Sequence, residues 1–358
     1  MDPEVSHGFS QGSPRLRWAT GPATTLWFSV NPGFGGSYKS LAASASGFWR
    51  FCPWPAAPGG AVLAPMEFFR PTAWADALAI KAGHPGVLPI AGGTDVMVDI
   101  NFDRVRPAAL LDLTGIRELA EWAADDGVIA LGAGVPYAQV ISDLAGRLPG
   151  LALASRTVGS PQIRNRGTVG GNLGSASPAG DAHPPLLACD TMVEAASVRG
   201  VRRIPIREFY TGVKRSALAP DELIAAVRIP AADGPQQFAK VGVRNAMVIA
   251  VSSFAIALHP ERGSVDTGLG SAAPTPRPAV AAEDFLGAEL AERGLWDSRG
   301  PLPETAVERF GELVAHAAAP IDDVRGSAAY RRHSLAVMAR RTLAWAWRSY
   351  QQEARQCA

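Results

Sequence analysis

The chain is poor in cysteine. It has three in 358 residues, at positions 52, 189 and 357. They lie far apart and form no Cys-x-x-Cys pair, so the sequence lacks the ligand spacing of a zinc site or an iron–sulfur cluster, and it lacks a disulfide framework. This cysteine usage is typical of a reducing compartment, and we expect the cytoplasm.

Closely spaced histidines and long apolar runs are missing too. The six histidines never recur three or four positions apart, as two metal ligands on one helix would. No apolar stretch reaches the roughly 20 residues that span a bilayer. From these absences we expect no bound metal and no membrane span.

Neither sign of charge is in excess. Lys and Arg total 34 and Asp and Glu total 33, so the formal net charge is +1. Proteins that bind nucleic acid carry a basic surface, so nucleic acid is not an expected partner. The composition is that of an ordinary globular protein, because 47% hydrophobic residues supply a core for one large domain or for two to three smaller ones.

Residues 1–65 differ from the rest of the chain. Gly, Pro, Ser and Ala dominate there, charges are sparse, and four tryptophans follow no helical or strand period. The segment has no basic start followed by an apolar stretch and a cleavage site, so it is not typical of a secretory signal. We expect a disordered extension or a translation start assigned too early, with Met66 as the true start. A docking arm that carries the tryptophans to a partner is the alternative.

From Met66 to about residue 235 the sequence alternates short strands and helices. Helical spacing of apolar residues, followed by Gly83 and Pro85, predicts a helix over residues 73–82. Pro136 is typical of a first helical turn and predicts a helix that runs to Leu144. Short apolar runs predict strands, the last two joined as a hairpin at 125–127: residues 87–90, 110–113, 119–123 and 128–131.

A second module begins near Gln236. Residues 246–258 are almost wholly apolar and predict one or two buried strands, with residues 265–273 as a pairing partner. Helices are expected over residues 281–293, 304–317 and 328–350. In the last helix an apolar stripe at offsets of three and four predicts packing on the chain's own sheet, with a subunit interface as the alternative: Leu335, Met338, Ala339, Leu343 and Ala346.

Two glycine pairs stand beside small hydroxyl residues, in Ala91-Gly92-Gly93-Thr94-Asp95 and in Thr168-Val169-Gly170-Gly171-Asn172. Such pairs let the backbone bend tightly and turn its N–H groups toward one point, as a bound phosphate requires. Neither segment fits the dinucleotide fingerprint Gly-x-Gly-x-x-Gly or the P-loop. Most glycine pairs simply serve turns, and the residues alone leave that alternative open.

Taken in order, the motifs resemble the FAD-binding medium subunit of the molybdenum hydroxylases, the family of xanthine dehydrogenase, aldehyde oxidoreductases and aerobic carbon monoxide dehydrogenase. The resemblance covers about residues 66–348. It implies an α+β fold: a two-part FAD-binding domain of the vanillyl-alcohol-oxidase (PCMH) type over residues 66–235, then a C-terminal α+β domain over residues 236–350. Residues 1–65 have no counterpart. The matching segments are residues 89–95, 160–173, 176–181, 209–212, 218–224, 273–276 and 330–332.

The resemblance also implies a cofactor site. The two glycine segments would hold the FAD pyrophosphate through backbone N–H groups and threonine hydroxyls. Asp181 matches a carboxylate on the FAD, and Lys240 matches a lysine near the flavin. The full cofactor-binding set comprises Pro89, Ile90, Ala91, Gly92, Gly93, Thr94, Asp95, Val96, Thr168, Val169, Gly170, Gly171, Asn172, Asp181, Ile224 and Lys240.

Some of these positions have plainer interpretations. Asp181 follows Gly180 and suits a turn or a helix cap, and Lys240, as a lone lysine on a strand, suits a solvated face. We expect His183 to be structural rather than catalytic. Arg164 and Arg166 are further candidates for phosphate contacts.

The chain offers no nucleophile, metal or acid–base pair, so we expect no catalytic side chain and assign the chemistry to the flavin. The resemblance implies a molybdenum cofactor on a large subunit and [2Fe-2S] clusters on a small subunit, which would pass electrons to FAD here and on to NAD+, oxygen or a quinone. The alternatives are a stand-alone flavin oxidoreductase of the same fold and a non-catalytic nucleotide-binding or assembly protein. The substrate would be chosen on another subunit.

Overall fold

Four sheets and the helices between them make up residues 66–357, the part of the chain that the computed structural model describes. The expectations for residues 1–65 lie outside the described residues. No helix within 66–357 is long and apolar enough to cross a membrane. In the same range, no cluster of His, Cys, Asp and Glu side chains is arranged to hold a metal ion.

A small parallel sheet opens the fold. Its strands β1 (Glu67–Phe69), β3 (Ala109–Asp112) and β2 (Leu88–Ile90) lie in the order β1-β3-β2, and helix α1 (Trp74–Gly83) connects β1 to β2. The buried Lys81 closes the turn after α1, because its Nζ donates to the carbonyls of Pro85 at 2.8 Å and Val87 at 2.9 Å. β2 ends directly at the first glycine segment, and that segment leads into α2 (Val96–Asn101).

The second sheet is antiparallel, with strand order β4-β5-β10-β6-β7. The predicted hairpin is confirmed, and Asp126 and Gly127 form its turn with φ of 45° and 72°. The strand expected at residues 119–123 begins only at Trp122, because residues 117–120 form a 3-10 helix that buries Leu119. The elements are η1 (Arg117–Ala120), β4 (Trp122–Asp125), β5 (Val128–Gly132), β6 (Met192–Ser197), β7 (Gly200–Pro205) and β10 (Leu223–Pro230).

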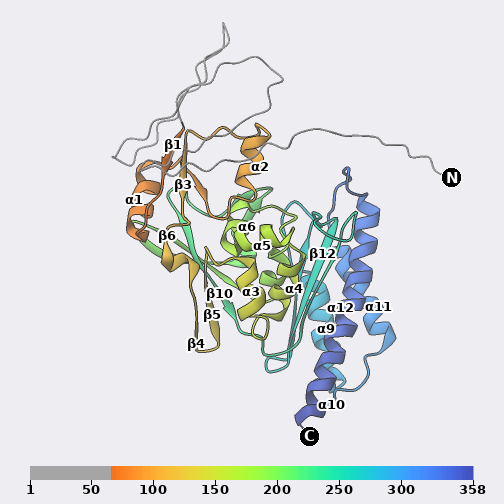
Figure 1. Cartoon of the computed structure of the whole chain (residues 1–358). Coiled ribbons are helices and arrows are strands. Elements are labelled where there is room, and N and C mark those ends of the chain that lie inside the picture. Colours follow the sequence, from red (N-terminus) through yellow and green to blue (C-terminus); the bar gives the residue numbers. More distant parts are fainter. Residues whose placement is uncertain (1–65, 358) are drawn as a thin grey trace, which may run out of the picture. The chain divides into compact units, whose positions relative to one another are not determined.

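Short helices fill the space beside this sheet, on the side that faces the C-terminal strands (Figure 1). The helix predicted to begin at Pro136 is confirmed as α3, with Pro136 as its N-cap. Ser160 caps α5, since its hydroxyl accepts from the N–H of Ile163 at 3.3 Å. The elements are α3 (Tyr137–Asp143), α4 (Pro149–Thr157), α5 (Pro161–Arg166), α6 (Val169–Ser175), α7 (His183–Leu187), α8 (Ile206–Phe209), β8 (Tyr210–Gly212) and β9 (Arg215–Ser216).

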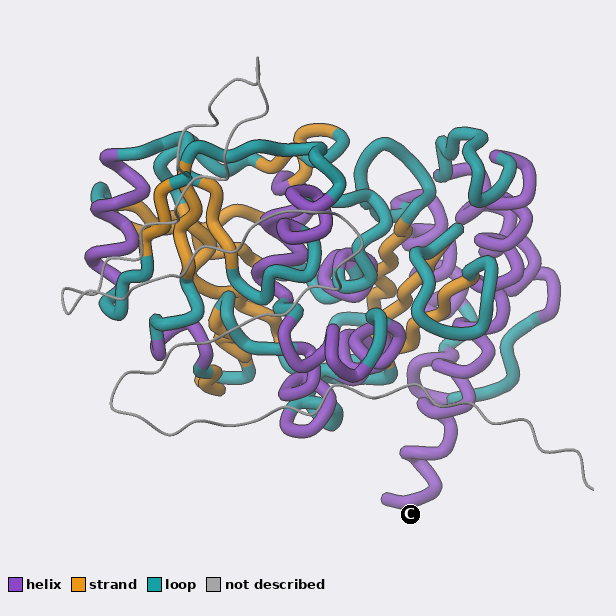
Figure 2. Tube along the Cα trace, turned by 45° about the horizontal axis from the view of Figure 1, so that its top comes forward, coloured by secondary structure: helices purple, strands orange, loops and turns teal. Residues whose placement is uncertain are grey.

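The C-terminal part is an antiparallel sheet with helices on both faces. α4 and α7 contact one face and α9 and α12 the other, and Figure 2 shows the same order of helices and strands from a second direction. The elements are β11 (Gln236–Val241), β12 (Ser252–His259), β13 (Ser264–Gly270), α9 (Val280–Glu292), α10 (Leu295–Ser298), α11 (Glu304–Ala317) and α12 (Ala328–Cys357).

The predicted helices are confirmed, but the predicted strand over residues 246–258 begins too early. The strand starts at Ser252, and Met247 before it has a left-handed φ of 50° and an exposed side chain. The apolar residues there belong to a loop, which periodicity alone does not distinguish from a strand. The stripe on α12 packs in the core with Phe254 of β12 and Phe310 of α11, which confirms the predicted packing on the chain's own sheet.

A partly buried charge network joins the two parts of the fold. His259, at the end of β12, bonds Asp233 through Nδ1 at 2.7 Å and faces Asp266 through Nε2 at 3.2 Å. Arg207 of α8 donates to Asp266 at 3.0 Å and to Glu283 of α9 at 3.4 Å. The network therefore links α8 of the first part to β13 and α9 of the second.

His259 is expected to make stability depend on pH. Burial opposes its charge, but hydrogen bonds to Asp266 and Asp233 outweigh burial and raise its pKa. A raised folded pKa gives stability that is complete below the unfolded value of about 6.5 and is lost as pH rises through the folded value. We expect the thermal midpoint to fall over that interval, and His259→Asn to flatten the fall. The exposed His316→Asn is the control; equal slopes for wild type and His259→Asn would contradict this assignment.

Candidate functional site

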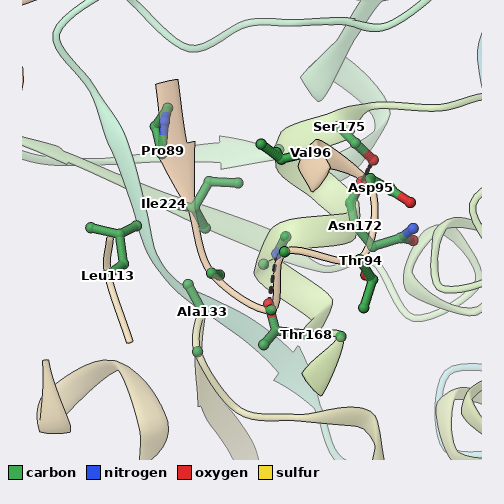
Figure 3. Close-up of a pocket in the computed structure, with 18 of the residues that line it drawn as sticks. Pro89, Thr94, Asp95, Val96, Leu113, Ala133, Thr168, Asn172, Ser175 and Ile224 are labelled. Carbon is green, nitrogen blue, oxygen red and sulfur yellow. Dashed lines mark hydrogen bonds between the residues drawn. The ribbon is translucent and has the colours of Figure 1, made fainter. Parts of the chain in front are cut away.

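A cavity of about 830 Å³ lies among the first sheet, the second sheet and helix α6. Figure 3 shows the polar side chains of Thr94, Asp95, Asn172 and Ser175 toward one end and the apolar Pro89, Leu113 and Ile224 toward the other. Most predicted cofactor residues line it: Pro89, Ala91, Gly92, Gly93, Thr94, Asp95, Val96, Thr168, Gly170, Gly171, Asn172 and Ile224.

Four predicted residues do not line this cavity. Ile90 ends β2 and packs beside Gly93, and Val169 is fully buried in the core. Asp181 and Lys240 pair with each other behind the wall of the cavity, and Lys240 Nζ lies 2.6 Å from Asp181 Oδ2. The structure thus brings the two glycine segments together and leaves Asp181 and Lys240 outside the lining, joined in an ion pair that the sequence did not predict.

The first glycine segment touches the backbone of the residues just before the second segment. A Cβ added at Gly92 would lie 1.9 Å from the carbonyl oxygen of Arg166 and 2.9 Å from Cα of Gly167. One added at Gly170 would lie 2.5 Å from Cβ of Ala133, just after β5. Side chains cannot fit at such separations, so these glycines are required for close approach. Gly93 is needed for its conformation, with φ of 75°.

The first glycine segment presents free backbone amides. Within residues 66–357, none of the N–H groups of residues 91–95 donates a hydrogen bond to the protein. Unpaired amides next to a cavity require another acceptor, and consecutive amides in a bent segment form a concave site for an anion.

The second glycine segment differs from the prediction of a loop. Gly170 and Gly171 lie in the first turn of α6, because the Thr168 hydroxyl accepts from the N–H of Gly171 at 2.9 Å and caps the helix. Figure 3 shows this bond as a dashed line. Thr168 is a preferred N-cap residue, so the helix start was visible in the sequence.

Of the two arginines predicted as phosphate contacts, one lines the cavity and the other does not. Arg166 lines the cavity, whereas Arg164 donates to the carbonyls of Val158 and Gly159, both at 3.0 Å, and holds the turn before α5. Lys214, which the sequence analysis missed, also lines the cavity and lies 3.5 Å from Asp99. A lone lysine in a turn gave no signal for this role.

The sequence did not predict most of the residues at the apolar end of the cavity. Of its residues only Pro89 and Ile224 were predicted. The others come from strand ends, from the 3-10 helix η1 and its N-cap, and from the loop before β10, and their signal was only that of core positions. They include Leu88, Leu113, Ile116, Leu119, Leu218 and Leu223.

Behind the wall, Asp181 and Lys240 form a buried ion pair. Their side chains are 9% and 6% exposed, and Lys240 Nζ also donates to the Thr157 carbonyl at 3.2 Å. Burial raises the pKa of Asp181 to about 6, against the opposing effect of Lys240. The Lys240 side chain is therefore not on a solvated face, and the Asp181 side chain caps no helix.

The chain matches two known domain families in succession. Residues 64–232 match the FAD-binding domain in molybdopterin dehydrogenase, and residues 237–346 match the C-terminal domain of the CO dehydrogenase flavoprotein. A xanthine dehydrogenase FAD-binding subunit of Escherichia coli O157:H7 is 30% identical over 290 residues, which cover 77% of this chain and 94% of that protein.

The chain belongs to this family of FAD-binding dehydrogenase subunits. The carbon monoxide dehydrogenase medium chain of Afipia carboxidovorans is 30% identical, with 78% of this chain and 95% of that one covered. The reconstituted CO dehydrogenase from Oligotropha carboxidovorans gives a TM-score of 0.72 at 27% identity, with coverage of 80% and 99%. The predicted family, its FAD-binding domain and the α+β fold class are thus confirmed, and the chain is an oxidoreductase subunit.

Proposed function

We propose that this chain is the electron-transfer subunit of a molybdenum-containing hydroxylase. It holds FAD in the cavity and takes electrons from [2Fe-2S] clusters on a small subunit, while a large subunit carries the molybdenum cofactor. NAD+ or another acceptor then receives the electrons. The observation that carries the proposal is the row of free amides at residues 91–95, packed against the second glycine segment.

The residues present fit FAD. The amides of residues 91–95 suit the oxygens of a pyrophosphate, and Gly92 lets the backbone of Arg166 and Gly167 approach this segment closely. The apolar end offers Pro89, Leu113 and Ile224 for contact with a ring system, and the polar end offers Thr94, Asn172 and Ser175. When bound, FAD supplies the two-electron and one-electron chemistry, while the protein binds and orients it.

Two further assignments belong to this proposal. Asp181 and Lys240 act on the cofactor from behind the wall as a charged pair, and Ile90 and Val169 support the glycine segments. We also propose that the functional domains are residues 66–235 and 236–350. The family matches to residues 64–232 and 237–346 support this division.

Purification tests the function. We expect the full chain to carry FAD with the visible absorption of an oxidised flavin, and to co-purify with a molybdenum subunit and an iron–sulfur subunit from its own cell. Bleaching of the flavin by NADH would support NAD+ as the acceptor. A colourless chain that rejects added FAD would contradict FAD binding, and full substrate oxidation by the isolated chain would support the stand-alone oxidoreductase.

A further inference from the structure

The side-chain carboxamide of Asn172 lies between the cavity and the core. It lines the cavity, yet its Oδ1 is fully buried and has no hydrogen-bond partner among residues 66–357. Its Nδ2 is not among the buried unpaired atoms and bonds no described residue, which leaves the amino group open to the cavity. A buried carbonyl oxygen without a donor is costly, so something must hold the carboxamide in this orientation.

His183 lies directly behind Asn172. Its side chain is fully buried, and its Nε2 also has no hydrogen-bond partner in the described part of the chain. A Cβ added at Gly180 would lie 2.3 Å from His183 Nε2 and 2.7 Å from Asn172 Oδ1, so both unpaired atoms face the same side of Gly180. Only a glycine at position 180 allows the imidazole and the carboxamide to approach there.

The partner on the other ring nitrogen favours one tautomer of His183. The Tyr210 hydroxyl lies 2.8 Å from His183 Nδ1. Burial raises the pKa of Tyr210 well above its ordinary value and lowers that of His183 to about 3, so the phenol keeps its proton and the imidazole is neutral. With Tyr210 donating to Nδ1, the ring proton sits on Nε2 and faces an acceptor. In the other tautomer the ring proton would sit on Nδ1. The buried lone pairs of His183 Nε2 and Asn172 Oδ1 would then face each other with no proton between them.

We propose that His183 is a positioning residue, whose Nε2–H, in the tautomer fixed by Tyr210, orients the Asn172 carboxamide so that its amino group faces the cofactor cavity. The inference rests on the proposed function, because the amino group is aimed at the place where FAD would bind. The competing acceptor is the Ser177 carbonyl, which already accepts from Gly180 N–H at 3.0 Å and acts to raise the pKa of His183.

FAD titration of the apoprotein, full chain, tests the inference. We expect His183→Leu to weaken FAD binding roughly tenfold, the size of the penalty for leaving a buried acceptor, here Asn172 Oδ1, against an apolar side chain. His183→Gln should stay within about threefold of wild type, because its amide nitrogen reaches the position of Nε2 and donates there. Thr191→Val is the matched control. It removes a buried hydroxyl that, like His183 Nε2, has no hydrogen-bond partner among the described residues, and it should leave FAD affinity unchanged.

A double-mutant cycle separates positioning from general packing. If His183 acts through Asn172, then His183→Leu has no further effect on FAD affinity in an Asn172→Ala background. Tyr210→Phe, which leaves the imidazole in place but frees its tautomer, should show the same non-additivity with a smaller loss. Additive effects in both cycles would overturn the inference and point to Ser177 as the acceptor.

The failure of this inference is distinguishable from that of the proposed function. Wild-type protein that binds FAD while the cycles are additive contradicts the role of His183 alone. Wild-type apoprotein that is folded and rejects FAD contradicts the proposed function and, with it, the inference. Tyr210→Phe keeps the test decisive if His183→Leu does not fold.

Discussion

Gly92→Ala is expected to remove FAD binding. The new Cβ would lie 1.9 Å from the Arg166 carbonyl oxygen, and the backbone of Gly167 is 2.9 Å away. Neither neighbour is a flexible side chain that can rotate aside, so the two glycine segments must separate. Overpacking of this kind costs about 1–3 kcal/mol in protein cores, and here the displaced atoms are the cofactor contacts themselves. We expect at least ~100-fold weaker FAD binding, measured by titration of the apoprotein.

Gly174 provides the matched control. It also lines the cavity, but a Cβ added there meets no atom within 4 Å. Because Gly174 is helical, alanine at this position should also stabilise α6 slightly, by about 0.5–1 kcal/mol. We expect Gly174→Ala to bind FAD like wild type. Equal FAD affinity of Gly92→Ala and Gly174→Ala would show that contact between the segments is not required.

The second large effect concerns the pair behind the wall. Asp181→Asn should destabilise the fold by roughly 3–5 kcal/mol, because it leaves the Lys240 ammonium buried without its counterion. The side chain of Lys240 is 6% exposed, and its only other acceptor among residues 66–357 is the Thr157 carbonyl at 3.2 Å. Denaturant unfolding of the apoprotein at neutral pH measures this loss.

Lys240→Met should cost less. The pKa of Asp181 is already raised to about 6 by burial, so without Lys240 the carboxyl takes up a proton and becomes neutral. The double variant Asp181→Asn with Lys240→Met should recover most of the loss. Single variants that cost the same, with effects that add in the double variant, would contradict a tightly coupled pair.

The sequence predicted the elements with strong periodicity and clear end signals. The helix over residues 304–317 was predicted with its observed bounds, and the hairpin turn at Asp126 and Gly127 was read from turn chemistry. The strand at residues 246–258 was placed too early, because a loop with apolar side chains looks like a buried strand until its backbone is known.

The residues of the candidate site were likewise predictable only in part. Glycine segments were predictable because close backbone approach restricts the residue type, as at Gly92 and Gly170. Leu113 and Lys214 were not, because leucine in a cavity wall and leucine in a core look alike in sequence, and a surface lysine looks like any other. The pairing of Asp181 with Lys240 joins positions 59 residues apart, and only the fold shows it.

The central claim is that the cavity between the glycine segments holds FAD for electron transfer. The most direct measurement is the flavin content of the purified full chain after reconstitution with FAD, for wild type, Gly174→Ala and Gly92→Ala. We expect one FAD per chain in the first two proteins and almost none in the third, with all three folded by circular dichroism. A folded wild-type chain without bound FAD, or a Gly92→Ala chain with full FAD, would contradict it.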